Sequence, residues 1–133
     1  MRPPVEKKLS ACLQEMLDAA TTIAEYIKGH NKGSFIANKM LHQAVALNML
    51  QIGQQCSAAI DLDPAFTAAH QQINWLSLRR MRNQIAHDYA AINISSIRNA
   101  AKIDVAATAD ALPALIAAAM QLEALAGKPK VTD

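Results

Sequence analysis

The sequence predicts an all-α protein folded as an antiparallel four-helix bundle with an additional short helix. Its 133 residues are 52% hydrophobic but only 4% aromatic, and the abundance of Ala, Leu, Ile and Met favours helices over strands. Apolar residues recur at helical spacing in several segments. The sequence has no strand-like alternation, internal repeat or linker, so we expect a single domain over residues 1–127.

The first half of the chain predicts two long helices. The first covers about residues 5–27, where these apolar residues recur near helical spacing: Val5, Leu9, Leu13, Met16, Ile23 and Ile27. Two glycines in GHNKGS interrupt the pattern, and Ser34 is the predicted N-cap of a second helix over 35–60. This second helix has no charge from Met40 to Ile60, but its Asn and Gln residues argue against a membrane span. We expect it to be buried on more than one side, in the bundle or against a second subunit.

A short helix and a third long helix follow. Asp63 can cap and Pro64 suits a first helical turn, which predicts the short helix over residues 64–72. Asn74 is the predicted cap of the helix over residues 75–91. The apolar stripe of that helix is Leu78, Met81, Ile85, Tyr89 and Ile92.

The C-terminal third predicts two helical pieces, over about residues 94–110 and 111–126. Pro113 lies early in the second piece, where a proline is tolerated. Gly127 ends it. Residues 128–133, KPKVTD, are expected to form a flexible tail.

Charge and cysteine usage point to a reduced, cytoplasmic setting and a local basic patch. The net charge is only +2, but the segment from Gln71 to Lys102 contains five positive residues and one negative residue. Such a patch can meet phosphate, or it can simply be a solvated helix face. Cys12 and Cys56 form no C-x-x-C pair and are expected to pack as small apolar groups. No apolar signal follows Met1.

Common cofactor and metal motifs are missing from the sequence. GHNKGS lacks the G-K-[ST] ending of a phosphate-binding loop. His30, His42 and His70 have no metal-ligand spacing to one another or to the cysteines. The acidic residues are scattered, which argues against a carboxylate-bound magnesium ion. We therefore expect neither a cofactor nor a metal.

The stretch RNQIAHDY, residues 82–89, concentrates the polar chemistry of the chain. On a helix Asn83 and His87 are i and i+4, so they share a face. Arg82 and His87 diverge by about 140° around the axis and cannot aim at one atom on an ideal helix. Either the helix bends, or two copies build the site across a twofold axis. Together with the uncharged second helix, this divergence predicts a homodimer with a shared cleft.

RNQIAHDY resembles the R-x4-H-x-Y signature of HEPN-domain proteins, in particular HepT-type toxins. Further segments of the chain are similar to that family: LNMLQIGQQ, AAHQQINWLSLRRMRN, AINISSI and ALPALIAAAMQLE. Asn83 fits the polar position after the arginine. Two departures stand out: Gln54 occupies a position where relatives often carry Glu, and the region around residues 101–110 is longer than usual.

The resemblance implies a dimeric four-helix-bundle endoribonuclease toxin that needs no metal, of a type II- or type VII-like toxin–antitoxin system. It implies a small nucleotidyltransferase antitoxin of the MntA type as partner. In HepT-type toxins the motif tyrosine receives AMP from that partner, which implies that Tyr89 is the modified residue.

RNA cleavage fits these residue types. The substrate carries its own 2′-OH nucleophile, and His87 has the intrinsic pKa to act as base or acid near neutrality. Arg82 offers a permanently charged fork for phosphate oxygens. Asn83 can orient the phosphate or the imidazole. Arg79 and Arg80 are better suited to guiding the RNA backbone.

Two other interpretations remain open. The chain can be a non-catalytic HEPN module that binds a nucleotide or a nucleotidyltransferase, or Asn83 and His87 can merely hydrogen-bond on a solvated face. The intact set of Arg, Asn, His and Tyr favours the enzyme. Bacterial growth arrest that is relieved by changing His87 would point to catalysis.

Overall fold

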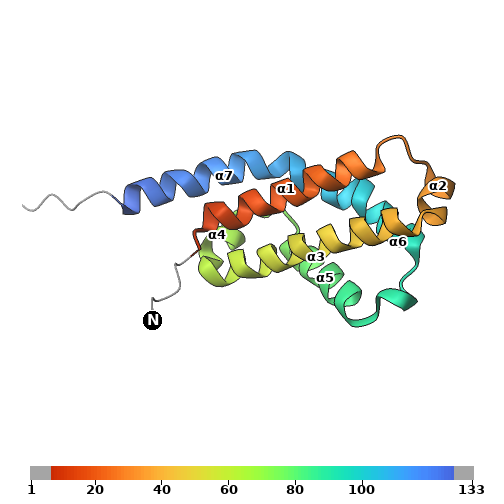
Figure 1. The fold of residues 1–133 in the computed structure, drawn as a ribbon. Helices are drawn as coiled ribbons and strands as arrows, with labels where there is room; N and C mark the ends of the chain where they lie inside the picture. The colour runs from red at the N-terminus through yellow and green to blue at the C-terminus, as the bar shows by residue number, and fades with distance from the viewer. Residues whose placement is uncertain (1–6, 128–133) are drawn as a thin grey trace, which may run out of the picture.

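The computed structural model describes residues 7–127, and every regular element in that range is helical (Figure 1). The predicted all-α class is therefore confirmed. Two predictions involve residues outside the described range: the start of the first helix at Val5 and the C-terminal tail over 128–133. Among the described residues the first helix begins at Leu9.

Four long helical segments form the body of the molecule. They are α1 (Leu9–Ile27), α3 (Lys39–Leu62), α5 (Trp75–Asp88) and a continuous run made of α6 (Ile94–Ala100), the π-helical segment η2 (Ala101–Val105) and α7 (Ala106–Ala126). Short elements connect them: α2 (Lys32–Ala37), α4 (Pro64–Ala69) and the 3₁₀ turn η1 (Tyr89–Ala91).

Helix α3 lies between α1 and α5, while α7 packs along the other side of α1 (Figure 1). Fully buried apolar side chains fill the space between these helices; they include Leu13, Met16, Ile23, Val45, Met49, Ile52, Leu78, Leu112 and Leu115. The prediction that the uncharged second helix is buried on more than one side is thus confirmed. One flank of α3 nevertheless faces solvent, because Met40 is 83% and Leu47 59% exposed.

The predicted second helix is in fact two helices, and its predicted cap is wrong. The chain breaks at Asn38, whose side chain accepts a hydrogen bond from the Leu41 amide and caps α3. Asn31 caps α2, and Ser34 completes a reciprocal capping box from inside the first turn. An Asn side chain can bind the free amides at a helix start, and it thereby competes with continuation of the preceding helix. Asn38 therefore ends α2 and starts α3.

The caps predicted for the next two helices are confirmed. The Asp63 carboxylate accepts from the Phe66 amide, with Pro64 as the first residue of α4. The Asn74 side chain accepts from the Ser77 amide at the start of α5. Both are short polar side chains that bond free amides of the first helical turn.

The predicted break near residue 110 is wrong, because the C-terminal run is helical without interruption from Ile94 to Ala126. Pro113 lies inside α7 instead of near a helix start. Buried side chains continue across the expected break at spacings of three and four, at Val105, Thr108, Leu112, Leu115 and Ala119. Burial of this stripe outweighs the cost of the proline, and the helix ends at Gly127 as predicted.

By length and composition this run also qualifies as a candidate membrane span. Its most apolar window has a mean hydropathy of 1.5, and 28% of that window is buried in the fold. The core helix of a globular protein meets the same criterion. Here α7 packs along α1, so the apolar composition has a use within the bundle.

Candidate active site

The RNQIAHDY motif occupies the last two turns of α5 and the residue after it. The α-helix ends at Asp88, and Tyr89 begins the 3₁₀ turn η1. The last three residues of the helix predicted over 75–91 are therefore 3₁₀-helical and not α-helical. Because α5 packs against α3, its residues divide between a flank beside α3 and a face that points away from it. The motif side chains lie on both.

Asn83 and His87 lie on the face of α5 that points away from α3. Both line an open hollow, and both are exposed. The other lining residues come from α5, the η1 turn and the start of α6: Arg80, Gln84, Asp88, Ala91, Ile92, Asn93 and Ser96. The i, i+4 spacing thus places an amide and an imidazole side by side, with the Arg80 cation in the same hollow.

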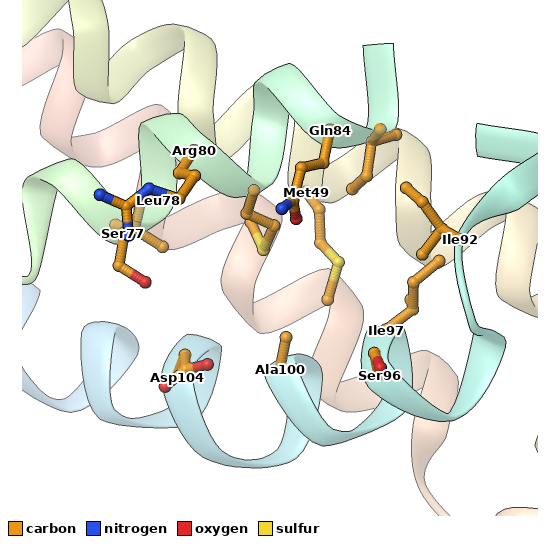
Figure 2. A pocket seen from close by; sticks show the side chains of 12 residues that line it. Met49, Ser77, Leu78, Arg80, Gln84, Ile92, Ser96, Ile97, Ala100 and Asp104 are labelled. Atoms are coloured by element: carbon orange, nitrogen blue, oxygen red, sulfur yellow. The ribbon is translucent and has the colours of Figure 1, made fainter. Parts of the chain in front are cut away.

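A second hollow continues from the first between α5 and the α6–η2 segment. Figure 2 shows Ser77, Arg80 and Gln84 on the α5 side, opposite Ser96, Ala100 and Asp104. Its apolar floor is formed by Met49, Leu78, Met81, Ile85 and Ile97. Four residues line both hollows, namely Arg80, Gln84, Ile92 and Ser96. The two hollows therefore form one groove with His87 at one end, an apolar floor and a polar rim.

Arg82 lies on the other flank of α5, beside α3. It is half-buried, and its Nη1 donates to the side-chain oxygen of Asn83 at 3.2 Å. Arg82 is not among the residues that line the groove. Within one chain Arg82 and His87 therefore do not meet at one point, as their spacing on a helix requires. Asn83 is the link between them, since it accepts from Arg82 and lines the hollow with His87.

Gly53 allows this close approach of α3 and α5. A Cβ atom at Gly53 would lie 2.2 Å from the Arg82 Cβ and 2.9 Å from the Leu78 carbonyl oxygen. The adjacent Gln54 is exposed on α3. Helix α5 thus rests on a notch in α3 that positions Arg82.

We predict that Gly53→Ala destabilises the protein by about 1–3 kcal/mol, because the new methyl overpacks the notch. An alanine inside a helix normally stabilises it by about 1 kcal/mol relative to glycine, so the sign of the change is informative. Urea denaturation followed by circular dichroism measures it. Gly33→Ala is the control, since a Cβ there meets only the Asn31 side chain at 3.4 Å. A Gly53→Ala protein that is as stable as Gly33→Ala would contradict the close contact.

Tyr89 points to the α3 flank rather than into the groove. It is half-buried, and its phenol oxygen lies 2.7 Å from Nδ1 of His42 on α3. Burial raises the pKa of the Tyr89 phenol. The sequence did not predict a role for His42 beside Tyr89. The available signal was its position three residues before Val45 and seven before Met49, both buried, which places an imidazole on the inner face of α3.

Arg79 and Arg80, both predicted to guide RNA, are exposed on different sides of α5. Arg80 lines the groove. The positive charge of Arg79 acts on Cys56, whose pKa is nevertheless raised to about 12 by burial. Both cysteines are buried and free, as predicted. The raised pKa leaves Cys56 a protonated thiol at neutral pH, with no nucleophilic role.

Comparison with known proteins assigns the family. Residues 16–120 match the family described as Ribonuclease HepT-like. The chain belongs to this family. A relative from Methanocaldococcus jannaschii, named "Putative RNase MJ1380", is 28% identical over 100 residues, which cover 75% of this chain and 89% of the relative. No solved structure matches the chain.

The match to the HepT-like ribonuclease family includes the whole groove. It runs from Met16 in α1 to Met120 in α7, so α3, α5 and the α6–η2 segment all lie within it. The resemblance noted on the RNQIAHDY stretch is thereby confirmed at the level of the family. Between residues 7 and 127, His, Cys, Asp and Glu side chains form no cluster of three or more that could hold a metal ion.

Proposed function

We propose that this HepT-like ribonuclease is a metal-independent endoribonuclease toxin that cleaves RNA at His87, with Arg82 and Asn83 as its catalytic partners. The observation that carries the proposal is the exposed pair of Asn83 and His87 in one hollow with Arg80. An imidazole in one hollow with a permanently charged guanidinium suits a phosphodiester. The groove beyond this hollow offers an apolar floor for bases and Arg80 for the backbone.

The proposed reaction needs only the substrate and side chains. A base removes the proton of the 2′-OH, the 2′-oxygen attacks the adjacent phosphorus, and the 5′-oxygen leaves with a proton from an acid. Cyclic 2′,3′-phosphate and 5′-OH ends result. His87 serves as base or acid, while the Arg82 guanidinium stabilises the charge that develops on the phosphate oxygens.

A homodimer completes the site in this proposal, because one chain leaves Arg82 and His87 on different sides of α5. The outer flank of α3 is uncharged and partly apolar: Met40 and Leu47 are exposed, and Leu47 lines a hollow with Ile85 and Tyr89. A second copy packed against this flank buries these side chains and forms a composite cleft next to Arg82. Two histidines in such a cleft divide the base and acid roles.

Control by an antitoxin is the remaining part of the proposal. A nucleotidyltransferase of the MntA type transfers AMP to Tyr89, and the added phosphate beside Arg82 competes with RNA phosphate. We place the system in the cytoplasm, away from membranes. The alternative is a non-catalytic module that binds a nucleotide or the nucleotidyltransferase; it is favoured by the separation of Arg82 from His87 within one chain.

We predict that RNA cleavage persists in excess chelator and leaves cyclic 2′,3′-phosphate ends. The reason is that the proposed reaction assigns every proton and charge to side chains. Digestion of labelled RNA with and without EDTA, with mass analysis of the product ends, tests this. Cleavage that stops in EDTA and returns with magnesium would show a metal-dependent site. Nucleotide binding without any cleavage would favour the non-catalytic module.

We also predict that the protein has twice the mass of one chain by light scattering at micromolar concentration. Leu47→Glu should reduce this to a single chain, because it buries a charge without a partner in the proposed interface. Leu122→Glu on α7 is the matched control, since Leu122 is 51% exposed against 59% for Leu47. A Leu47→Glu protein that remains dimeric would exclude this flank of α3 as the interface.

A further inference from the structure

The hydrogen bond between Tyr89 and His42 joins two helices at the edge of the motif. His42 lies on the first turn of α3, and Tyr89 follows the last residue of α5, so 47 positions separate them in the sequence. The phenol oxygen and Nδ1 are 2.7 Å apart. This contact is the one hydrogen bond recorded for the Tyr89 hydroxyl with any residue between 7 and 127.

Burial fixes His42 in place. Its side chain is 9% exposed, and its ring lies 6.2 Å from the ring of Phe35 on α2 and 6.4 Å from that of Tyr89. The backbone amide of His42 donates to Asn38, so the residue is also held in the first turn of the helix. In this buried ring Nδ1 lies toward the phenol.

The hydrogen bond can form with the phenol as its donor. A phenol carries one proton and a neutral imidazole carries one, on either ring nitrogen. In the tautomer with the ring proton on Nε2, the phenol donates to Nδ1. Proton transfer from the phenol requires this direction, because only an Nδ1 without a proton can take up the phenol proton.

We propose that His42 is the base that makes Tyr89 a nucleophile for nucleotidyl transfer. This inference rests on the proposed modification of Tyr89 and names a residue of this chain that takes part in it. A phenol loses its proton only well above neutral pH, so its oxygen needs a proton acceptor in order to attack at neutral pH. Nδ1 of His42 is at hydrogen-bond distance of the oxygen, the geometry that proton transfer requires.

The step balances with a nucleoside triphosphate as co-reactant. The Tyr89 oxygen attacks the α-phosphorus and forms an O–P bond, while the bond from that phosphorus to the β-phosphate bridging oxygen breaks and pyrophosphate leaves. The phenol proton passes to Nδ1, which makes His42 an imidazolium. Release of this proton to water through Nε2 restores the neutral ring for another transfer.

His42 as a restraint on the phenol and His42 as a base predict opposite results when the residue is removed. If the hydrogen bond merely holds the phenol inward, removing His42 frees Tyr89 and speeds its modification. If His42 is the base, removing it slows modification. His42→Phe keeps an aromatic ring of similar size without an acceptor, while His42→Asn keeps an acceptor near the Nδ1 position that cannot take up a proton.

The first experiment measures the rate of adenylate transfer from ATP by the cognate nucleotidyltransferase, using intact mass in single turnover. We expect a loss of about 10²- to 10⁴-fold in His42→Phe, the usual range for a lost general base, and a loss of at least about tenfold in His42→Asn. A wild-type or faster rate in His42→Phe would overturn the inference. Circular dichroism verifies that the variants are folded. Wild-type protein that is never modified overturns the proposed modification instead.

A second experiment needs no antitoxin. N-acetylimidazole acetylates phenols: the oxygen attacks the acetyl carbon, imidazole leaves, and the phenol gives up its proton. The chain has two tyrosines, and Tyr26, 43% exposed, is the internal reference in peptide mass mapping. We expect the ratio of Tyr89 to Tyr26 acetylation to fall at least about tenfold in His42→Phe and in His42→Asn. An unchanged or higher ratio in both variants shows that His42 does not activate the phenol, whatever the partner does.

Discussion

His87→Ala is expected to lose RNA cleavage by about 10²- to 10⁴-fold, the range for removal of a general acid or base. The side chain is exposed, so its truncation should change the free energy of unfolding by no more than about 0.5 kcal/mol. The loss is therefore chemical and not a consequence of unfolding. Single-turnover cleavage of labelled RNA, together with thermal melting by circular dichroism, measures both quantities.

His30→Ala is the matched control for His87→Ala. His30 lies in the turn between α1 and α2 and contacts Ser34 through Nδ1, so its loss removes an imidazole outside the groove. Cleavage by His30→Ala should equal that of the wild type. Full activity in His87→Ala would remove the proposed mechanism, and equal losses in both variants would point to a general effect on the fold.

Arg82→Ala tests the same mechanism at a second residue. Arg82 is half-buried beside Gly53 and bonds to Asn83, so Arg82→Ala removes both a charge and a support for Asn83. Its loss should match that of His87→Ala in a dimer with a composite cleft. In a site confined to one chain the loss should be smaller, because Arg82 does not line the hollow that contains His87.

The sequence predicted the parts of the site that depend on local geometry. Helical spacing put Asn83 and His87 on one face and separated Arg82 from His87, and the structure has this arrangement. The caps at Asp63 and Asn74 were also predictable, because a capping side chain and the amide it binds are close in sequence. These features depend on a few adjacent residues and on the regular geometry of a helix.

The rest depends on contacts between distant segments. Nothing local indicates that Asn93 and Ser96 form the other wall of the hollow beside His87, or that Met49 lies in the floor of the groove. The notch at Gly53 appears in the sequence as one glycine in a helix, which predicts only a weak position. Its use becomes evident when Arg82, 29 positions later, is seen against it.

The C-terminal run shows how tertiary packing overrides a local rule. Pro113 predicted a helix start nearby, and the two expected pieces were divided before it. In the structure a stripe of buried residues spaced by three and four crosses that point without a break. Burial against α1 was not available to a single-sequence argument, and it decides the outcome.

Tyr89→Phe is the other change with a large expected effect, since it should abolish modification by the nucleotidyltransferase altogether. The variant keeps the ring that packs beside Ile85 and Leu47 and loses only the oxygen. His42 then has no partner for Nδ1, which should cost about 1–3 kcal/mol of stability and leave the protein folded. RNA cleavage should persist, because neither His87 nor Arg82 bonds to the phenol.

Co-expression with the antitoxin separates modification from simple binding. Intact mass should rise by whole adenylate units on the wild type and on Tyr26→Phe, the control for the exposed tyrosine, but not on Tyr89→Phe. Cells should be protected from the first two proteins and arrested by the third. If the antitoxin protects cells from Tyr89→Phe as well, and no protein gains mass, then neutralisation occurs by binding alone. The hydrogen bond between Tyr89 and His42 would in that case stabilise the junction of α3 and α5 without serving any transfer.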